Sequence, residues 1–200
     1  MIRLLLVLFI SLPVVAAAQG FPALYDVTGV ASDDVLNVRA GPGAAHPIIG
    51  ELAHDAVDIE VVARADGADW GLVNVGERSG WTSLAFLARQ PGEWNAVPTT
   101  ITSCFGTEPF WDITGLNFTL SLQNYGEPVF SAPTSGPMPA PWADRLGVTA
   151  SGRDRHLSLV VRGEACNDGM SDQAFGLSAT AISEIDGASQ MWLGCCSVGR

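Results

Sequence analysis

The fold expected for the first half of this 200-residue chain follows from one stretch, Leu36-Asn37-Val38-Arg39-Ala40-Gly41-Pro42-Gly43. Leu36 and Val38 alternate with Asn37 and Arg39, and this alternation is typical of a half-buried strand. The following Gly-Pro-Gly favours a tight turn, because glycine adopts backbone angles that other residues avoid and proline fixes its own. The stretch therefore predicts a short strand that ends in a turn.

Further short strands surround this one. Period-two patterns predict strands over 25–30, 35–39, 48–52, 57–63, 70–75 and 80–83, and turn sequences occupy 41–43, 66–69 and 76–79. No long helical period interrupts them. This density of short strands is typical of a small β-barrel.

Three motifs occur in a fixed order in this half: LNVRAGPG at 36–43, DWGLVNV at 69–75 and SGWTSLAFL at 79–87. Together they resemble the bacterial SH3 domain, and the resemblance covers residues 25–87. It implies an SH3-like barrel over 24–88. It also implies a binding module of a cell-envelope protein, of a kind often linked to peptidoglycan.

Four residues of the expected barrel are candidates for ligand contact: Asn37, Arg39, Trp70 and Trp81. Aromatic faces stack on sugar rings or peptide planes, and the two polar side chains can bond a peptide or a carboxylate. A structural role is the alternative for each of them. Trp81, which follows Gly80, is favoured as a core residue, and the alternative for Asn37 and Arg39 is that they brace the next turn.

The N-terminus has the features of a secretory signal peptide over residues 1–18. A basic start at Arg3 precedes an apolar run and then Ala16-Ala17-Ala18, the small residues that signal peptidase requires. The run is shorter than the roughly 20 residues of a membrane span, although an uncleaved anchor is the alternative. No cysteine lies nearby to carry a lipid. We therefore expect a periplasmic or secreted protein without stable membrane insertion after cleavage.

The chain is acidic, with a formal net charge of −11, which becomes −12 without Arg3. Such a charge repels nucleic acid and anionic lipid headgroups, so nucleic acid is not an expected partner.

Residues 89–100 are expected to be a linker, because Pro91 and Pro98 interrupt regular strand pairing. Period-two patterns then recur from 101 to 200, with Phe118, Leu120 and Leu122 on one expected face. They predict a second antiparallel β-domain, a sandwich or partly closed barrel. A Pro-rich stretch at 132–142 is expected to be a long loop.

All four cysteines, Cys104, Cys166, Cys195 and Cys196, lie in this second half. An even number in an exported protein indicates disulfides. A bond between the neighbours Cys195 and Cys196 is disfavoured by backbone geometry, which leaves two possible pairings. A metal site is the alternative, but the spacing is not that of thiol ligands. We expect neither a metal nor a cofactor.

Three further motifs lie in this half: GTEPFW at 106–111, CNDGMSD at 166–172 and GC at 194–195. In this order they resemble a family of uncharacterised exported domains from envelope proteins of Gram-negative bacteria. The resemblance implies no known activity. It does imply the pairings Cys166–Cys195 and Cys104–Cys196.

Glu108, Asp168 and Asp172 lie within these motifs and are candidates for carboxylate chemistry. Asn167-Asp168-Gly169 is also an ordinary turn sequence, and Ser171 lacks the setting of a catalytic nucleophile. We therefore expect no catalytic residues and a binding protein that contacts peptidoglycan or an envelope protein. The alternative is a cell-wall hydrolase accessory, a lysozyme-type inhibitor or an enzyme with its chemistry in the second domain.

Overall fold

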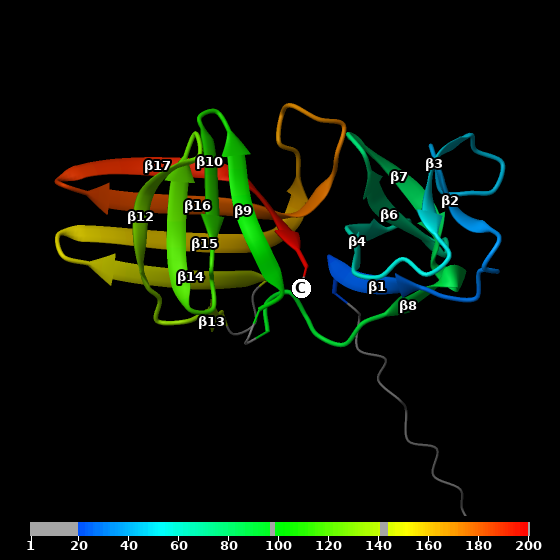
Figure 1. Ribbon diagram of the computed structural model, residues 1–200, viewed down its shortest axis with the longest axis horizontal. Helices are drawn as coiled ribbons and strands as arrows, with labels where there is room; N and C mark the ends of the chain where they lie inside the picture. Colours follow the sequence, from blue (N-terminus) through cyan, green and yellow to red (C-terminus); the bar gives the residue numbers. More distant parts are fainter. Residues whose placement is uncertain (1–19, 97–98, 141–143, 200) are drawn as a thin grey trace, which may run out of the picture.

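Antiparallel strands make up nearly all the regular structure of the chain, which confirms the all-β fold class (Figure 1). The computed structural model describes residues 20–96, 99–140 and 144–199. The expected signal peptide, 1–18, lies outside the described residues. Within the described part of the chain, no helix has both the length and the apolar character needed to cross a membrane.

Residues 23–89 form two small sheets around one core. The first has the order β4-β1-β8, and the second has the order β3-β2-β7-β6-β5. The strands are β1 (Ala23–Val27), β2 (Val35–Arg39), β3 (Ile48–Ala53), β4 (Ile59–Val61), β5 (Ala63–Arg64), β6 (Trp70–Val75), β7 (Arg78–Ser83) and β8 (Leu87–Arg89), with a 3-10 turn at Leu84–Phe86. Leu36 and Val38 are buried in this core with Val61 and Val73, as the alternation of β2 predicts.

The expected strand 57–63 is two strands, β4 and β5. β4 pairs with β1 in one sheet, whereas β5 pairs with β6 in the other. The chain therefore passes from one sheet to the other at Val62. A single hydrophobic run cannot reveal this change, because the run reads the same whether one strand or two form within it.

Residues 101–198 form one nine-stranded sheet with the order β12-β11-β10-β9-β17-β16-β15-β14-β13. Its strands are β9 (Ile101–Thr107), β10 (Phe110–Thr114), β11 (Thr119–Asn124), β12 (Glu127–Pro133), β13 (Met138–Pro139), β14 (Arg145–Gly152), β15 (Arg155–Cys166), β16 (Phe175–Ile185) and β17 (Ala188–Val198).

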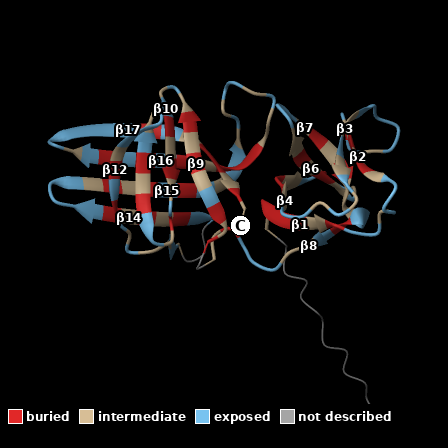
Figure 2. Ribbon diagram, viewed as in Figure 1, coloured by how far each residue is buried: buried red, intermediate tan, exposed pale blue. Residues whose placement is uncertain are grey.

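This sheet curls into a half-barrel. Its first strands, β9 to β12, cross over β14 to β17, and a bridge between Thr134 and Ala150 brings the two ends together (Figure 1). The buried residues of this sheet lie along β9 to β12 and along β14 to β17, whereas the hairpin tips are exposed (Figure 2). The large core contains Leu120, Leu122 and Trp192.

Two expectations for this half are wrong. Phe118 is 81% exposed rather than aligned with Leu120 and Leu122, because it lies in the turn before β11 begins. The Pro-rich stretch is not entirely a loop, because Ala132 and Pro133 end β12, and Met138–Pro139 form β13. β13 is an edge strand, where proline is tolerated since no partner needs its missing N–H.

Both disulfides lie in the half-barrel. Cys104 on β9 is bonded to Cys196 on β17, its cross-strand partner, and Cys166 at the end of β15 is bonded to Cys195. These are the pairs that the second family resemblance implies. No cysteine of the described chain is free.

The two halves pack closely against each other. Leu24 of β1 belongs to the core of the half-barrel, and Trp94 of the expected linker is also buried there. Gly176 leaves no room for a side chain, because a Cβ at this position would lie 2.8 Å from Pro22 Cδ and 3.0 Å from the Val62 carbonyl oxygen. The arrangement of the halves is therefore held by side-chain packing as well as by the connecting chain.

Hydrogen bonds add a second connection between the halves, at residues 172–174, here called the clasp. The Ser79 N–H donates to the Asp172 carbonyl oxygen (2.8 Å), and the Asp172 N–H donates to the Glu77 carbonyl oxygen (3.0 Å). The Asn74 side chain bonds both backbone groups of Ala174, at 2.9 and 3.0 Å. The clasp therefore joins the loop after β15 to the β6–β7 hairpin.

Candidate functional site

An open groove of about 540 Å³ lies on the first half of the chain. It is here called the barrel groove, after the small barrel that the sequence predicts for this half. Three of the four residues expected to contact a ligand, Asn37, Arg39 and Trp70, line it. They come from β2 and β6, which are separated by β7 in the sheet. Sheet pairing thus brings together residues that lie far apart in the sequence.

Strand alternation explains why these side chains face the groove. Leu36 and Val38 are buried, so Asn37 and Arg39 project from the opposite face of β2. On β6, Gly71 and Val73 are buried, and Trp70 is accordingly on the outer face with its cross-strand partner Ser83.

Arg39 has a structural contact as well as a place in the groove. Its Nη1 donates to the His46 carbonyl oxygen at 2.8 Å, so the guanidinium also holds the turn that follows β2. Asp34 lines the same groove and accepts a hydrogen bond from the Val35 N–H at 2.8 Å. The groove therefore contains one cationic and one anionic side chain.

Phe86 and Val30 also line the groove, although sequence reasoning did not single them out. Phe86 ends the 3-10 turn after β7 and is 41% exposed, so it offers a large apolar surface to the groove. Its carbonyl oxygen accepts a hydrogen bond from the Thr28 N–H at 2.9 Å, which holds the loop containing Val30 close by. The only sequence signal for Phe86 was its place within the SGWTSLAFL motif.

Trp81 lies neither in the groove lining nor among the buried core residues. Its neighbours Gly80 and Thr82 take the inward positions of β7, and Trp81 is on the outer face opposite Arg39. The inward position of Gly80 has no space for a side chain, since a Cβ there would lie 2.6 Å from Val38 Cγ1. The interpretation of Trp81 as core is therefore wrong.

A second open cleft, of about 560 Å³, lies on the half-barrel. Glu108, Glu164 and Asp168 line it, but Asp172 does not. Glu164 is already paired, because Arg162 Nη1 lies 3.0 Å from its Oε2 and the Ser178 hydroxyl donates to its Oε1 at 2.5 Å. Two of the three motif carboxylates, Glu108 and Asp168, thus share this cleft, whereas Asp172 lies outside its lining.

Asp168 organises its own loop. Its Oδ1 accepts hydrogen bonds from the Met170 and Ser171 N–H groups at 3.0 and 2.9 Å, and its Oδ2 accepts one from the Ser171 hydroxyl at 2.9 Å. Desolvation acts to raise the pKa of this carboxyl, but these hydrogen bonds outweigh it and lower the pKa below its ordinary value. Ser171 is therefore committed to Asp168 as a donor.

Metal ligands are not grouped in the described ranges, where no cluster of three or more His, Cys, Asp or Glu side chains could hold an ion. The barrel groove brings aromatic, cationic, anionic and amide side chains together.

Comparison with known proteins identifies no relative, since no family model, curated protein or solved structure matches the chain.

Proposed function

We propose that the protein is an exported, non-catalytic binding protein of the bacterial cell envelope, and that its barrel groove holds a peptide segment of peptidoglycan or of an envelope protein. The observation that carries this proposal is the grouping of Asn37, Arg39 and Trp70 around one groove. Their residue types suit a peptide, because an aromatic face, an amide and a guanidinium together recognise apolar side chains, backbone groups and carboxylates.

The groove chemistry favours an extended peptide over an anionic polymer. Trp70 and Phe86 offer apolar surface, while Arg39 and Asp34 offer one charge of each sign. The chain as a whole has a formal charge of −11, which repels polyanions. A peptide that carries both an amine and a carboxylate therefore fits better than an acidic wall polymer.

The contacts of Asp168 and Asp172, two of the three motif carboxylates, support a non-catalytic role. Asp168 already accepts three hydrogen bonds within its loop, and the backbone of Asp172 pairs with the β6–β7 hairpin. General acid–base catalysis needs a side chain within reach of a substrate proton. The Asp168 side chain instead holds its own loop, and the Asp172 backbone holds the clasp.

Two disulfides in a chain of this size support an exported location, because such bonds persist in oxidising compartments. The proposed location is the periplasm or the extracellular space.

The test is retention of the chain from Gln19 onward on purified peptidoglycan and, separately, on immobilised periplasmic extract. Replacing Trp70 with Ala should weaken retention about tenfold, which corresponds to about 1.4 kcal/mol for the loss of an aromatic contact. Val57→Ala is a matched control, since Val57 lies on the same half, is 62% exposed and does not line the groove.

Retention that depends on Trp70 and Arg39 but not on Val57 is the expected result. The proposal is wrong if the folded chain is retained on neither material, or if Trp70→Ala and Val57→Ala are retained equally well. Thermal unfolding of each variant establishes that a loss of retention is not a loss of folding.

A further inference from the structure

Two exposed aromatic side chains meet at one end of the half-barrel. Phe110, at the start of β10, and Tyr125, in the β11–β12 turn, are 45% and 68% exposed. Their ring centroids lie 5.8 Å apart with an interplanar angle of 66°. The Tyr125 N–H donates to the Phe110 carbonyl oxygen at 2.8 Å, so the backbone holds the two side chains together.

Tyr125 has a left-handed backbone conformation, which is unfavourable for a bulky side chain. Its φ is +50°, and Gly126 follows at +79°, as in a two-residue hairpin turn of the kind that Asn-Gly usually forms. Three other non-glycine residues in the described ranges have positive φ, and all are aspartates, whose short side chains tolerate this conformation: Asp58, Asp154 and Asp186.

Burial does not explain the tyrosine at this position, because most of its side chain faces solvent. A bulky residue held in a disfavoured conformation suggests a function for the exposed ring.

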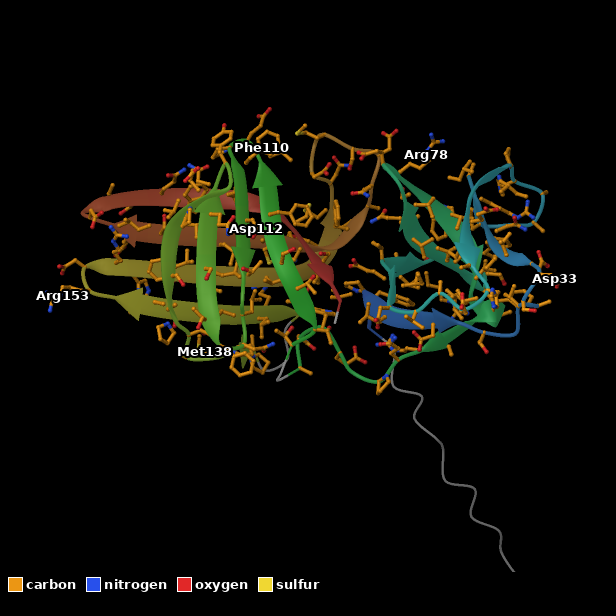
Figure 3. All side chains as sticks on the ribbon, in the orientation of Figure 1. Asp33, Arg78, Phe110, Asp112, Met138 and Arg153 are labelled. Atoms are coloured by element: carbon orange, nitrogen blue, oxygen red, sulfur yellow. A yellow bond between two sulfur atoms is a disulfide. The ribbon has the colours of Figure 1, made fainter. Side chains whose placement is uncertain are left out.

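Polar side chains lie directly beside this aromatic pair. Asp112 and Gln123 are cross-strand partners on β10 and β11, and they share the outer face because Trp111, Ile113 and Leu122 are buried. Phe110, Asp112, Gln123 and Tyr125 line one open hollow of about 400 Å³. Figure 3 shows Phe110 at the end of the half-barrel and Asp112 further along the same strand.

We infer that this hollow binds a neutral, β-linked pyranose glycan, with sugar rings packed against the aromatic side chains of Phe110 and Tyr125 and sugar hydroxyls bonded to Asp112 and Gln123. Pyranose rings present a flat face of C–H groups to an aromatic ring and hydroxyl groups at their edge. An aromatic pair next to a carboxylate and an amide matches both features, because the carboxylate accepts hydrogen bonds and the amide both donates and accepts them.

The charge of the site favours a neutral glycan. Asp112 is the charged side chain of the hollow, and the chain carries 21 acidic against 10 basic residues. An anionic sugar would be repelled by both. Burial also raises the pKa of Asp112, so this carboxyl already has less water around it than an open surface group.

The test is isothermal titration calorimetry of the folded chain from Gln19 onward with three defined hexasaccharides. Two are β-1,4-linked, of glucose and of N-acetylglucosamine, and the third is the α-1,4-linked glucose hexamer. We expect at least one β-linked hexasaccharide to bind and the α-linked one to bind at least about tenfold more weakly, since the α linkage curves the chain and changes how successive sugar rings are presented to the two aromatic side chains.

Tyr125→Asn separates binding from folding. Asparagine suits the left-handed conformation, so the Tm should rise by a few degrees, while glycan affinity should fall at least about tenfold. Asp112→Asn should also weaken binding, because an amide accepts fewer hydrogen bonds than a carboxylate. Phe118→Ala is the matched control, as it removes another exposed aromatic side chain from the turn at the opposite end of β10.

The inference is overturned if the folded chain binds neither β-linked hexasaccharide, or if Tyr125→Asn binds as tightly as the unsubstituted chain. It is also overturned if Trp70→Ala, and not Tyr125→Asn, abolishes binding, because the glycan would then occupy the barrel groove. Peptide binding in the groove is measured separately, so failure of either site leaves the other open to test.

Discussion

Replacement of Glu60 with glutamine should remove most of the pH dependence of stability between pH 5 and pH 8. Glu60 lies on β4 opposite Leu24, at the interface of the two halves. Its Oε1 is buried and has no hydrogen-bond partner among the described residues. Desolvation raises the pKa of this carboxyl from 4.5 to about 8, although a hydrogen bond from the Val198 backbone acts in the opposite direction.

The direction in which the free energy of unfolding changes with pH follows from proton binding. Between pH 4.5 and about 8 the folded chain holds a proton on Glu60 that the unfolded chain has released, so the free energy of unfolding falls as the pH rises. Each pH unit in this range removes about 1.4 kcal/mol. The shift to about 8 therefore sets a ceiling of about 5 kcal/mol for the loss. Local opening of the interface, which would hydrate the carboxylate, makes the measured loss smaller.

The substituted glutamine does not ionise, so its contribution to stability stays constant over this range. Its amide group brings a new donor, and leaving that donor unpaired costs about 1–3 kcal/mol at every pH. We therefore expect Glu60→Gln to be less stable than the unsubstituted chain near pH 5 and equally or more stable near pH 8.

Urea unfolding followed by tryptophan fluorescence, repeated from pH 4.5 to pH 8.5, measures this difference. Subtracting the two curves at each pH cancels the titration of groups that both proteins share. Glu51→Gln, which makes the same change at an exposed glutamate on β3, is the matched control. Parallel curves for Glu60→Gln and the unsubstituted chain would show that Glu60 has no raised pKa in the folded chain.

Three other substitutions, and a fourth that serves as a control, test the interface and the Asp168 loop by urea unfolding. Asn74→Ala removes both side-chain hydrogen bonds to the clasp and should lower the free energy of unfolding by about 1–3 kcal/mol; an unchanged value would contradict a stabilising clasp. Gly176→Ala places a Cβ against the first half and should cost about 1–3 kcal/mol, whereas Gly152→Ala, with open space around it, should be nearly neutral. Asp168→Ala should cost about 1–2 kcal/mol at pH 7. Because the folded pKa of Asp168 is lowered, this cost should shrink as the pH falls below about 4, and a cost independent of pH would argue against the carboxylate as the acceptor that holds the loop.

Strand alternation predicted much of the fold because each strand buries one face. It placed Leu36 and Val38 in the core and put Asn37 and Arg39 on the outer face. It was misleading where a strand had not yet begun, as at Phe118, since a pattern of apolar residues does not mark the first paired residue. Trp81 was misassigned to the core for another reason, because the inward positions of β7, at Gly80 and Thr82, have room only for small side chains.

The candidate groove was predictable only in part. Residue chemistry pointed to Asn37, Arg39 and Trp70, but their meeting depends on the order β2-β7-β6, which local patterns do not encode. The role of the 172–174 segment was not predictable for the same reason. Its backbone pairs with Glu77 and Ser79, which are distant in the sequence, and backbone pairing leaves little mark on residue type.

The close packing of the two halves holds the two proposed sites at a fixed spacing. Contacts at the clasp, Leu24 and Gly176 join the two halves into one body. The barrel groove and the hollow beside Phe110 and Tyr125 therefore do not lie on two loosely tethered domains. Peptidoglycan contains both peptides and a β-linked glycan, so one polymer offers ligands to both proposed sites. Once one site is occupied, the other meets its ligand at a raised effective concentration, provided that the fixed geometry matches the spacing in the polymer. Under this proposal, a rigid spacing would favour polymers whose peptide and glycan ligands match it, and modest affinity at each site would be sufficient for retention on the wall.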